Sequence, residues 1–112
     1  MSVLMIPILA GEVENWKKMS QEFSGSKKEE FEDFNKRYGL TRHDAWLWET
    51  DSNTLAVVMH EGPGEEEVMK KLAESNYDFD TWFRNKISTV HGIDFSQAPD
   101  AKPLQQYIRS RH

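Results

Sequence analysis

Two predicted strands joined by a turn occupy residues 41–61, which read TRHDAWLWETDSNTLAVVMHE. Both halves are rich in tryptophan and aliphatic side chains, as is typical of strands. The tripeptide DSN at residues 51–53 has the composition of a turn. We therefore expect antiparallel strands at residues 41–51 and 53–61, and the rest of the fold follows from what surrounds them.

The register of these two strands decides which side chains share a face. In one register Trp48 lies opposite Ala56. In that register Asp44 lies opposite His60. A slip of one residue pairs Trp48 with Val57 and moves the histidine to the other face. We favour the first register because large side chains pack best opposite small ones.

An apolar strand is expected upstream at residues 3–9, with Pro7 at its exit or at a bulge because proline cannot donate to a sheet. One amphipathic helix is expected over residues 12–38, irregular near Gly25 and ending before Gly39. Its apolar residues fall on one side when stepped at about 100° per residue. They are Val13, Trp16, Met19, Phe23, Phe31, Phe34 and Tyr38.

The downstream half carries two shorter helical patterns. The segment GPG at residues 62–64 ends the hairpin, and Val68 and Leu72 mark the apolar face of a helix that follows it. A second helix is expected over residues 79–91, with Asp78 as its N-cap and Gly92 as its stop. Residues 96–103 are a polar connector, and residues 104–109 are a possible last strand. The element order is therefore β-α-β-β-α with a possible closing strand.

Composition limits the class of protein. The 112 residues make one domain, 1–112, with 38% apolar and 29% charged residues. A net charge of −5 argues against a nucleic-acid partner. The absence of cysteine excludes disulfides and thiol chemistry. The apolar start, residues 3–10, has no basic leader and is too short to cross a membrane. We expect a cytoplasmic protein with no membrane partner.

No motif identifies a catalytic residue, and we expect no cofactor. The sequence has no Ser-His-Asp pattern and no glycine-rich phosphate loop. His43, His60, His91 and His112 lack the spacing of metal ligands, so no metal site is expected either.

The tryptophans are the main indication of a site. Trp46 and Trp48 share a sheet face with Arg42 and Asp44 by the period of two. They either pack in the core or form the wall of an aromatic cavity with a polar end. His91 either stabilises a helix end in its protonated form or faces a pocket. Trp16 and Trp82 belong to the core or cover such a cavity. The candidate ligand-binding residues are Arg42, Asp44, Trp46, Trp48, His60, Trp82 and His91.

Several segments together resemble a known superfamily. They are ILAGE at residues 8–12 leading to Trp16, LTR at 40–42 with Trp46-Leu47, AVV at 56–58, and FDTWFR at 79–84 followed by HGID at 91–94. The chain is similar over residues 3–95 to the small dimeric α/β-barrel proteins of the ferredoxin-like type. That superfamily includes antibiotic-biosynthesis monooxygenase-like, stress-responsive and haem-degrading proteins. More narrowly, the chain resembles an uncharacterised bacterial subgroup.

The resemblance implies a β-α-β-β-α-β fold and a homodimer in which two sheets meet face to face. It leaves three functions open, because one fold hosts many activities. The first, which we prefer, is a binding protein for a small apolar or aromatic ligand. The second is a cofactor-independent monooxygenase acting on an aromatic substrate. The third is haem binding through His91, His60 or His43, although no asparagine matches the one used by the haem-degrading relatives.

Overall fold

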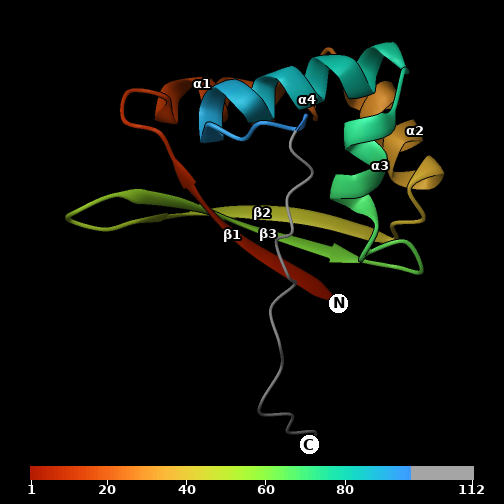
Figure 1. Ribbon diagram of the computed structural model, residues 1–112, viewed down its shortest axis with the longest axis horizontal. Coiled ribbons are helices and arrows are strands. Elements are labelled where there is room, and N and C mark those ends of the chain that lie inside the picture. Colours follow the sequence, from red (N-terminus) through yellow and green to blue (C-terminus); the bar gives the residue numbers. More distant parts are fainter. Residues whose placement is uncertain (97–112) are drawn as a thin grey trace, which may run out of the picture.

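The structure, a computed structural model, describes residues 1–96. Within this range three strands form one antiparallel sheet, and four helices lie together on one side of it (Figure 1). The predicted α+β class is thereby confirmed. The elements are β1 (Ser2–Ile8), α1 (Val13–Glu22), α2 (Lys28–Arg37), β2 (Arg42–Glu49), β3 (Thr54–Glu61), α3 (Val68–Glu74) and α4 (Asp78–His91).

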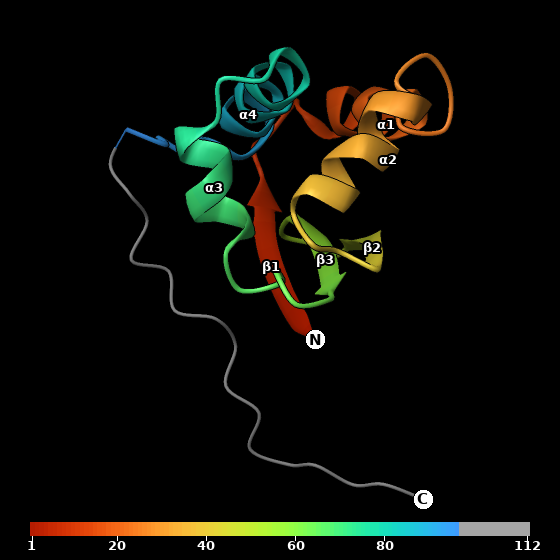
Figure 2. The same cartoon turned by 90° about the vertical axis from the view of Figure 1, so that its right-hand side faces the viewer.

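The described sheet has the order β1-β3-β2, so the predicted hairpin forms its centre and one edge (Figure 2). The favoured register is wrong, and so is the alternative. Trp48 pairs with Leu55, and His43 pairs with His60. Thr50 belongs to the turn instead of the ladder, because its amide donates to the Asn53 carbonyl at 2.8 Å. The turn therefore takes four residues and shifts every pair.

Strand β1 contains the expected proline next to its last residue. Pro7 pairs with Leu55, and only one side of β1 is paired within residues 1–96. A proline is tolerated there because an edge strand does not need every amide for the ladder. Of the two predicted positions for Pro7, a bulge is wrong, and the proline lies inside the ladder one residue before the strand ends.

The expected long helix over residues 12–38 is wrong: two helices, α1 and α2, take its place. The break lies around Gly25, where the amide of Lys27 donates to the carbonyl of Glu22 at 2.8 Å and so leaves the helical ladder. The common apolar face survives the break. Phe23 and Phe31, one on each side of it, stack with ring centroids 4.3 Å apart.

Helices α3 and α4 form where the downstream patterns predicted them. Gly92 ends α4 with a φ of +70°, which favours glycine, as expected. Asp78 is not the N-cap: Tyr77 holds that position, and Asp78 is the first helical residue. The negative charge of Asp78 still lies at the positive end of the helix dipole. The connector beyond residue 96 and the possible strand at 104–109 lie outside the described residues.

The loop after β3 contacts the end of α2 through its backbone. Gly64 donates its amide to the carbonyl of Gly39 at 3.1 Å. A Cβ added at Gly64 would lie 1.9 Å from the Tyr38 carbonyl oxygen, so no larger residue fits without a shift. This contact holds the helix layer against the open end of the hairpin.

A buried carboxylate joins α2 to α4. Asp80, with none of its surface exposed, accepts two hydrogen bonds from Arg37 at 2.7 and 2.9 Å. It also accepts from the Tyr38 hydroxyl at 2.9 Å and the Ser75 hydroxyl at 2.6 Å. The cost of burying the charge is thus offset by a paired guanidinium and two hydroxyls.

None of the helices among residues 1–96 combines the length and the apolar character that crossing a membrane requires.

Candidate functional site

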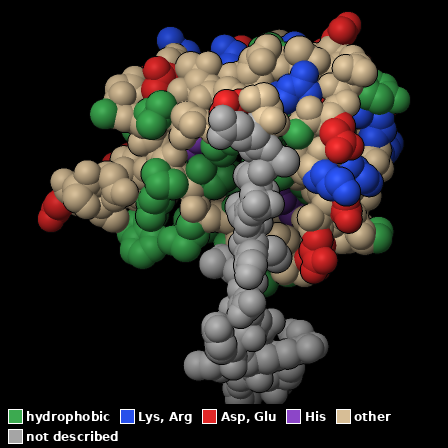
Figure 3. Space-filling model, in the orientation of Figure 1, with side chains coloured by type: hydrophobic (Ala, Val, Ile, Leu, Met, Phe, Trp, Pro, Cys, Tyr) green, Lys and Arg blue, Asp and Glu red, His purple; other side chains and the backbone are tan. Residues whose placement is uncertain are grey.

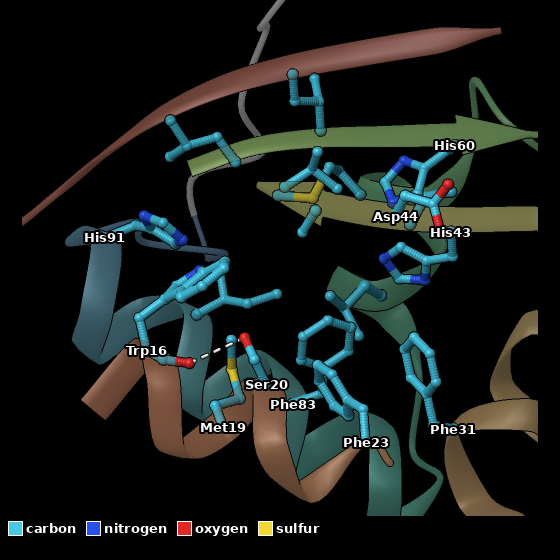
Figure 4. A pocket seen from close by; sticks show the side chains of 18 residues that line it. Trp16, Met19, Ser20, Phe23, Phe31, His43, Asp44, His60, Phe83 and His91 are labelled. Atoms are coloured by element: carbon cyan, nitrogen blue, oxygen red, sulfur yellow. Dashed lines mark hydrogen bonds between the residues drawn. The ribbon is translucent and has the colours of Figure 1, made fainter. Parts of the chain in front are cut away.

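A cavity of about 390 Å³ lies between the helix layer and the face of the sheet that it covers (Figure 4). This volume falls in the range of small-molecule sites. Most of the wall is apolar. The apolar lining residues are Leu4, Ile6, Trp16, Met19, Phe23, Phe31, Ala45, Val58, Val68, Met69, Leu72, Phe83 and Ile87.

The strand residues reach the cavity because side chains alternate between the two faces of a sheet. His43 and Ala45 of β2 point to the covered face, as do Val58 and His60 of β3, their ladder partners. We call this the inner sheet face. The opposite, outer sheet face carries Arg42, Asp44, Trp46 and Trp48 from β2, Val3, Met5 and Pro7 from β1, and Leu55, Val57 and Met59 from β3.

Helix α1 supplies the opposite wall. Trp16, Met19 and Phe23 recur at helical spacing and turn toward the sheet (Figure 4). Ser20 lies between them, and its hydroxyl donates to the Trp16 carbonyl at 3.0 Å. The predicted stripe of α1 therefore forms part of a cavity wall as well as part of the core.

Two histidines lie together at one end of the cavity (Figure 4). The rings of His43 and His60 meet edge to face with centroids 4.5 Å apart. The Nδ1 atom of His43 lies 2.9 Å from the Oδ1 atom of Asn35 on α2. Phe31 covers the His43 ring from the helix side at a centroid distance of 5.0 Å. The pair is thus fixed by the ladder, by one hydrogen bond and by an aromatic contact.

Both imidazoles are neutral at neutral pH. Burial lowers the pKa of His43 to about 3, and the neighbouring His60 contributes to the lowering. Burial also lowers the pKa of His60 to about 4, against the opposing effect of Glu65. Each ring therefore presents one N–H group and one lone pair instead of a positive charge.

His91 lies at the other end of the cavity (Figure 4). Its Nδ1 atom is 2.8 Å from the Pro7 carbonyl oxygen, which joins the last residue of α4 to β1. Burial lowers its pKa, although the hydrogen bond to Pro7 acts the other way. Of the two interpretations of His91, the structure therefore favours the pocket position over a protonated helix end.

The structure brings together only part of the predicted site. Asp44, His60 and His91 line the cavity, whereas Arg42, Trp46, Trp48 and Trp82 do not. Trp46 and Trp48 are 50% and 54% exposed on the outer sheet face. These two residues do not line the cavity, because the observed register places them on the outer sheet face and His60 on the inner sheet face.

Trp82 lies on α4 beside the cavity, outside its lining. Its ring is 5.6 Å from that of Phe79 and 6.1 Å from that of Phe23, measured between centroids. The ammonium of Lys27 lies over the ring at 4.9 Å. Trp82 therefore belongs to the packed interface between α1 and α4.

The sequence reasoning missed the role of His43 as the neighbour of His60 and the role of Ser20. A signal for His43 was present: Ala45 and Leu47 share its face, and both are small or aliphatic residues suited to packing under helices. Nothing in the sequence marks Ser20, which lies between apolar residues of one helical turn.

Among residues 1–96, no three histidine or acidic side chains lie close enough together to hold a metal ion. Comparisons with protein families, with curated proteins and with solved structures found no match. Function is therefore inferred from the cavity and the surfaces of this chain itself.

Proposed function

We propose that this chain is a homodimeric protein of the α/β-barrel type that binds a small apolar or aromatic ligand in the cavity beneath its helices. The observation that carries the proposal is the pocket of about 390 Å³, partly open to solvent, between the helix layer and the inner sheet face. Packed layers of a protein normally leave no hollow of this size between them, and its apolar wall stays in contact with water unless a ligand covers it. Apolar walls with a few polar groups are typical of ligand sites.

The homodimer part of the proposal is supported by the outer sheet face. Met5, Trp46 and Trp48 are between 44% and 54% exposed there, next to aliphatic residues of β3. Figure 3 shows hydrophobic side chains gathered on the sheet side of the molecule. A second copy is the natural cover for such a face, because two identical apolar sheets complement each other across a two-fold axis.

Ligand binding is tested with N-phenyl-1-naphthylamine, a neutral dye whose fluorescence rises in apolar sites. Saturable binding is expected for the wild-type chain. Ser20→Phe should abolish it, because the new ring occupies the cavity beside Trp16. Gln21→Phe, at the exposed neighbouring position of α1, is the control and should bind as the wild type does. Equal binding by both variants would contradict the proposal.

The two other functions implied by the resemblance stay predictions. Oxygenation of an aromatic substrate and haem binding would each use this same cavity, since His43, His60 and His91 all line it. Trp46 is no part of either, because it lies on the outer sheet face.

A further inference from the structure

The polar atoms that line the cavity have a common character, which narrows the class of ligand. His43 is the first case. Its Nδ1 atom contacts the amide oxygen of Asn35, which can only accept, so the proton of the ring lies on Nδ1. The ring is neutral, and its Nε2 atom therefore carries a lone pair. Figure 4 shows this ring extending from β2 into the cavity.

His91 and Ser20 repeat the arrangement. The Nδ1 atom of His91 contacts the Pro7 carbonyl, so the proton is again on Nδ1 and the lone pair on Nε2. The hydroxyl proton of Ser20 is given to the Trp16 carbonyl, which leaves only lone pairs on Oγ. Three side chains that line the cavity at separate places thus each use their proton on a protein oxygen and keep an acceptor atom.

The charges around the cavity also disfavour an anionic ligand. No lysine or arginine is among the residues within 1–96 that line the cavity. Asp44 also borders the cavity, but its carboxylate lies on the outer sheet face, where it accepts a hydrogen bond from Arg42. His60 is the one lining histidine within 1–96 whose tautomer no protein contact fixes, and it supplies a single N–H group at most. A carboxylate in this cavity would lose its hydration without a cation and would face lone pairs.

We propose that the cavity selects neutral, mainly apolar molecules that carry a hydroxyl or N–H group, and that it rejects carboxylates of the same shape. This rests on the proposed function, since it specifies the ligand of the same cavity. The ligand donates to the Nε2 atom of His43 or of His91, while its apolar body contacts the aromatic and aliphatic walls. A buried acceptor without a partner is costly, so a ligand without a donor binds less well.

The test compares three molecules of nearly one shape by calorimetric titration at neutral pH: β-naphthol, its methyl ether and β-naphthoate. Naphthol should bind about tenfold more tightly than the methyl ether, the worth of one or two hydrogen bonds. Naphthoate should show no saturable binding. If the methyl ether or naphthoate binds as tightly as naphthol, this inference is overturned while the proposed binding function stands. If none of the three binds, and the neutral dye does not bind either, both fail.

Two variants locate the acceptor. His43→Leu and His91→Leu each remove one lone pair and keep an apolar wall. In at least one of them the ratio of naphthol to methyl-ether affinity should fall toward one. The ratio is measured within a single variant, so a loss of folded protein cancels. An unchanged ratio in both variants would overturn the assignment of these histidines as acceptors.

Discussion

Two adjacent neutral histidines make the stability of this protein sensitive to mild acid. His43 and His60 have an ordinary pKa of 6.5, and in the folded chain burial holds their pKa values at about 3 and about 4. Below pH 6.5 the unfolded chain therefore binds protons that the folded chain does not. Folding stability is full above that pH and declines as the pH falls toward the folded values. The lone pair that His43 offers to the cavity persists over the same range.

We expect the free energy of unfolding to fall on acidification from pH 6.5 toward pH 4. The fall is at most about 1.4 kcal/mol per pH unit for each histidine, the free energy of one pKa unit. His43→Phe removes one of the two groups and should make the decline shallower. Urea unfolding at a series of pH values measures it. The effect belongs to this pair if the slope falls in the variant; an equal slope in both proteins would assign the decline to other groups.

The protonation of Asp80 also affects folding stability, because burial and hydrogen bonds shift its pKa in opposite directions. Burial alone would raise its pKa, but hydrogen bonds from Arg37, Ser75 and Tyr38 outweigh it and lower the pKa below the ordinary value of 3.8. A lowered acid pKa gives stability that is present above pH 3.8 and is lost as the pH falls further. The loss of this contribution therefore begins at a lower pH than the decline caused by the two histidines.

Asp80→Ala should destabilise the fold by about 3 kcal/mol, because it leaves the Arg37 guanidinium without its buried partner. Urea unfolding at neutral pH measures the loss. Asp33 bonds the same arginine from the surface, at 2.7 Å, with a side chain 63% exposed. Asp33→Ala is thus a matched control, for which we expect less than about 1 kcal/mol. Similar losses of stability in the two variants would show that the burial of Asp80 adds nothing to the strength of its ion pair with Arg37.

At the scale of elements, the local pattern predicted the type of each strand and helix but not how they join. Strand β2, strand β3 and the apolar stripes of α1, α2 and α4 all form where the periodicity placed them. The predicted register was wrong by one residue because it assumed that Thr50 belongs to the ladder. The Thr50 hydroxyl instead bonds to Asn53, which places Thr50 in the turn. The prediction of a single helix through Gly25 was wrong because the apolar residues keep the same phase whether one helix or two helices form.

The register error also explains the error in the site. A shift of one residue changes which face of the sheet a side chain occupies relative to its neighbour strand. With His60 opposite Asp44, the histidine would share a face with Trp46; with His60 opposite His43, it does not. The helix side of the cavity could be predicted from the apolar stripe that contains Trp16 and Phe23. The histidine pair could not, because it depends on the pairing of His43 with His60 in the ladder.

The junction between α2 and the loop after β3 gives a prediction at this scale. A Cβ at Gly64 would meet the Tyr38 carbonyl oxygen at 1.9 Å, so backbone would have to move. Gly64→Ala should therefore cost more than about 2 kcal/mol, as strained backbone substitutions do. A Cβ at Gly25 would lie 3.2 Å from the Gln21 carbonyl oxygen. The effect of Gly25→Ala, the comparison, should stay within about 1 kcal/mol. Thermal unfolding of both variants measures the difference, and equal melting temperatures would contradict the packing described.

In the whole molecule, the two faces of the sheet have different surroundings. The inner sheet face borders the cavity, and four helices cover it. Within residues 1–96 no element lies over the outer sheet face, which keeps Trp46 and Trp48 about half exposed. A chain of this size gains stability by burying such a surface against a partner. Assembly and ligand binding are therefore expected to be independent, since they use opposite faces.

That independence can be tested with one substitution. Light scattering of the wild-type chain should give the mass of two chains, and Trp46→Glu should give the mass of one, because a carboxylate would be buried without a partner between the sheets. Tyr77→Glu is the matched control: Tyr77 is also an exposed aromatic, at 59%, but it lies at the start of α4 on the helix side and should leave the dimer intact. The monomeric variant should still bind the neutral dye if the cavity needs no residue from the partner. A wild-type chain with the mass of one, or a Trp46→Glu variant that stays dimeric, would contradict an interface through the outer sheet face.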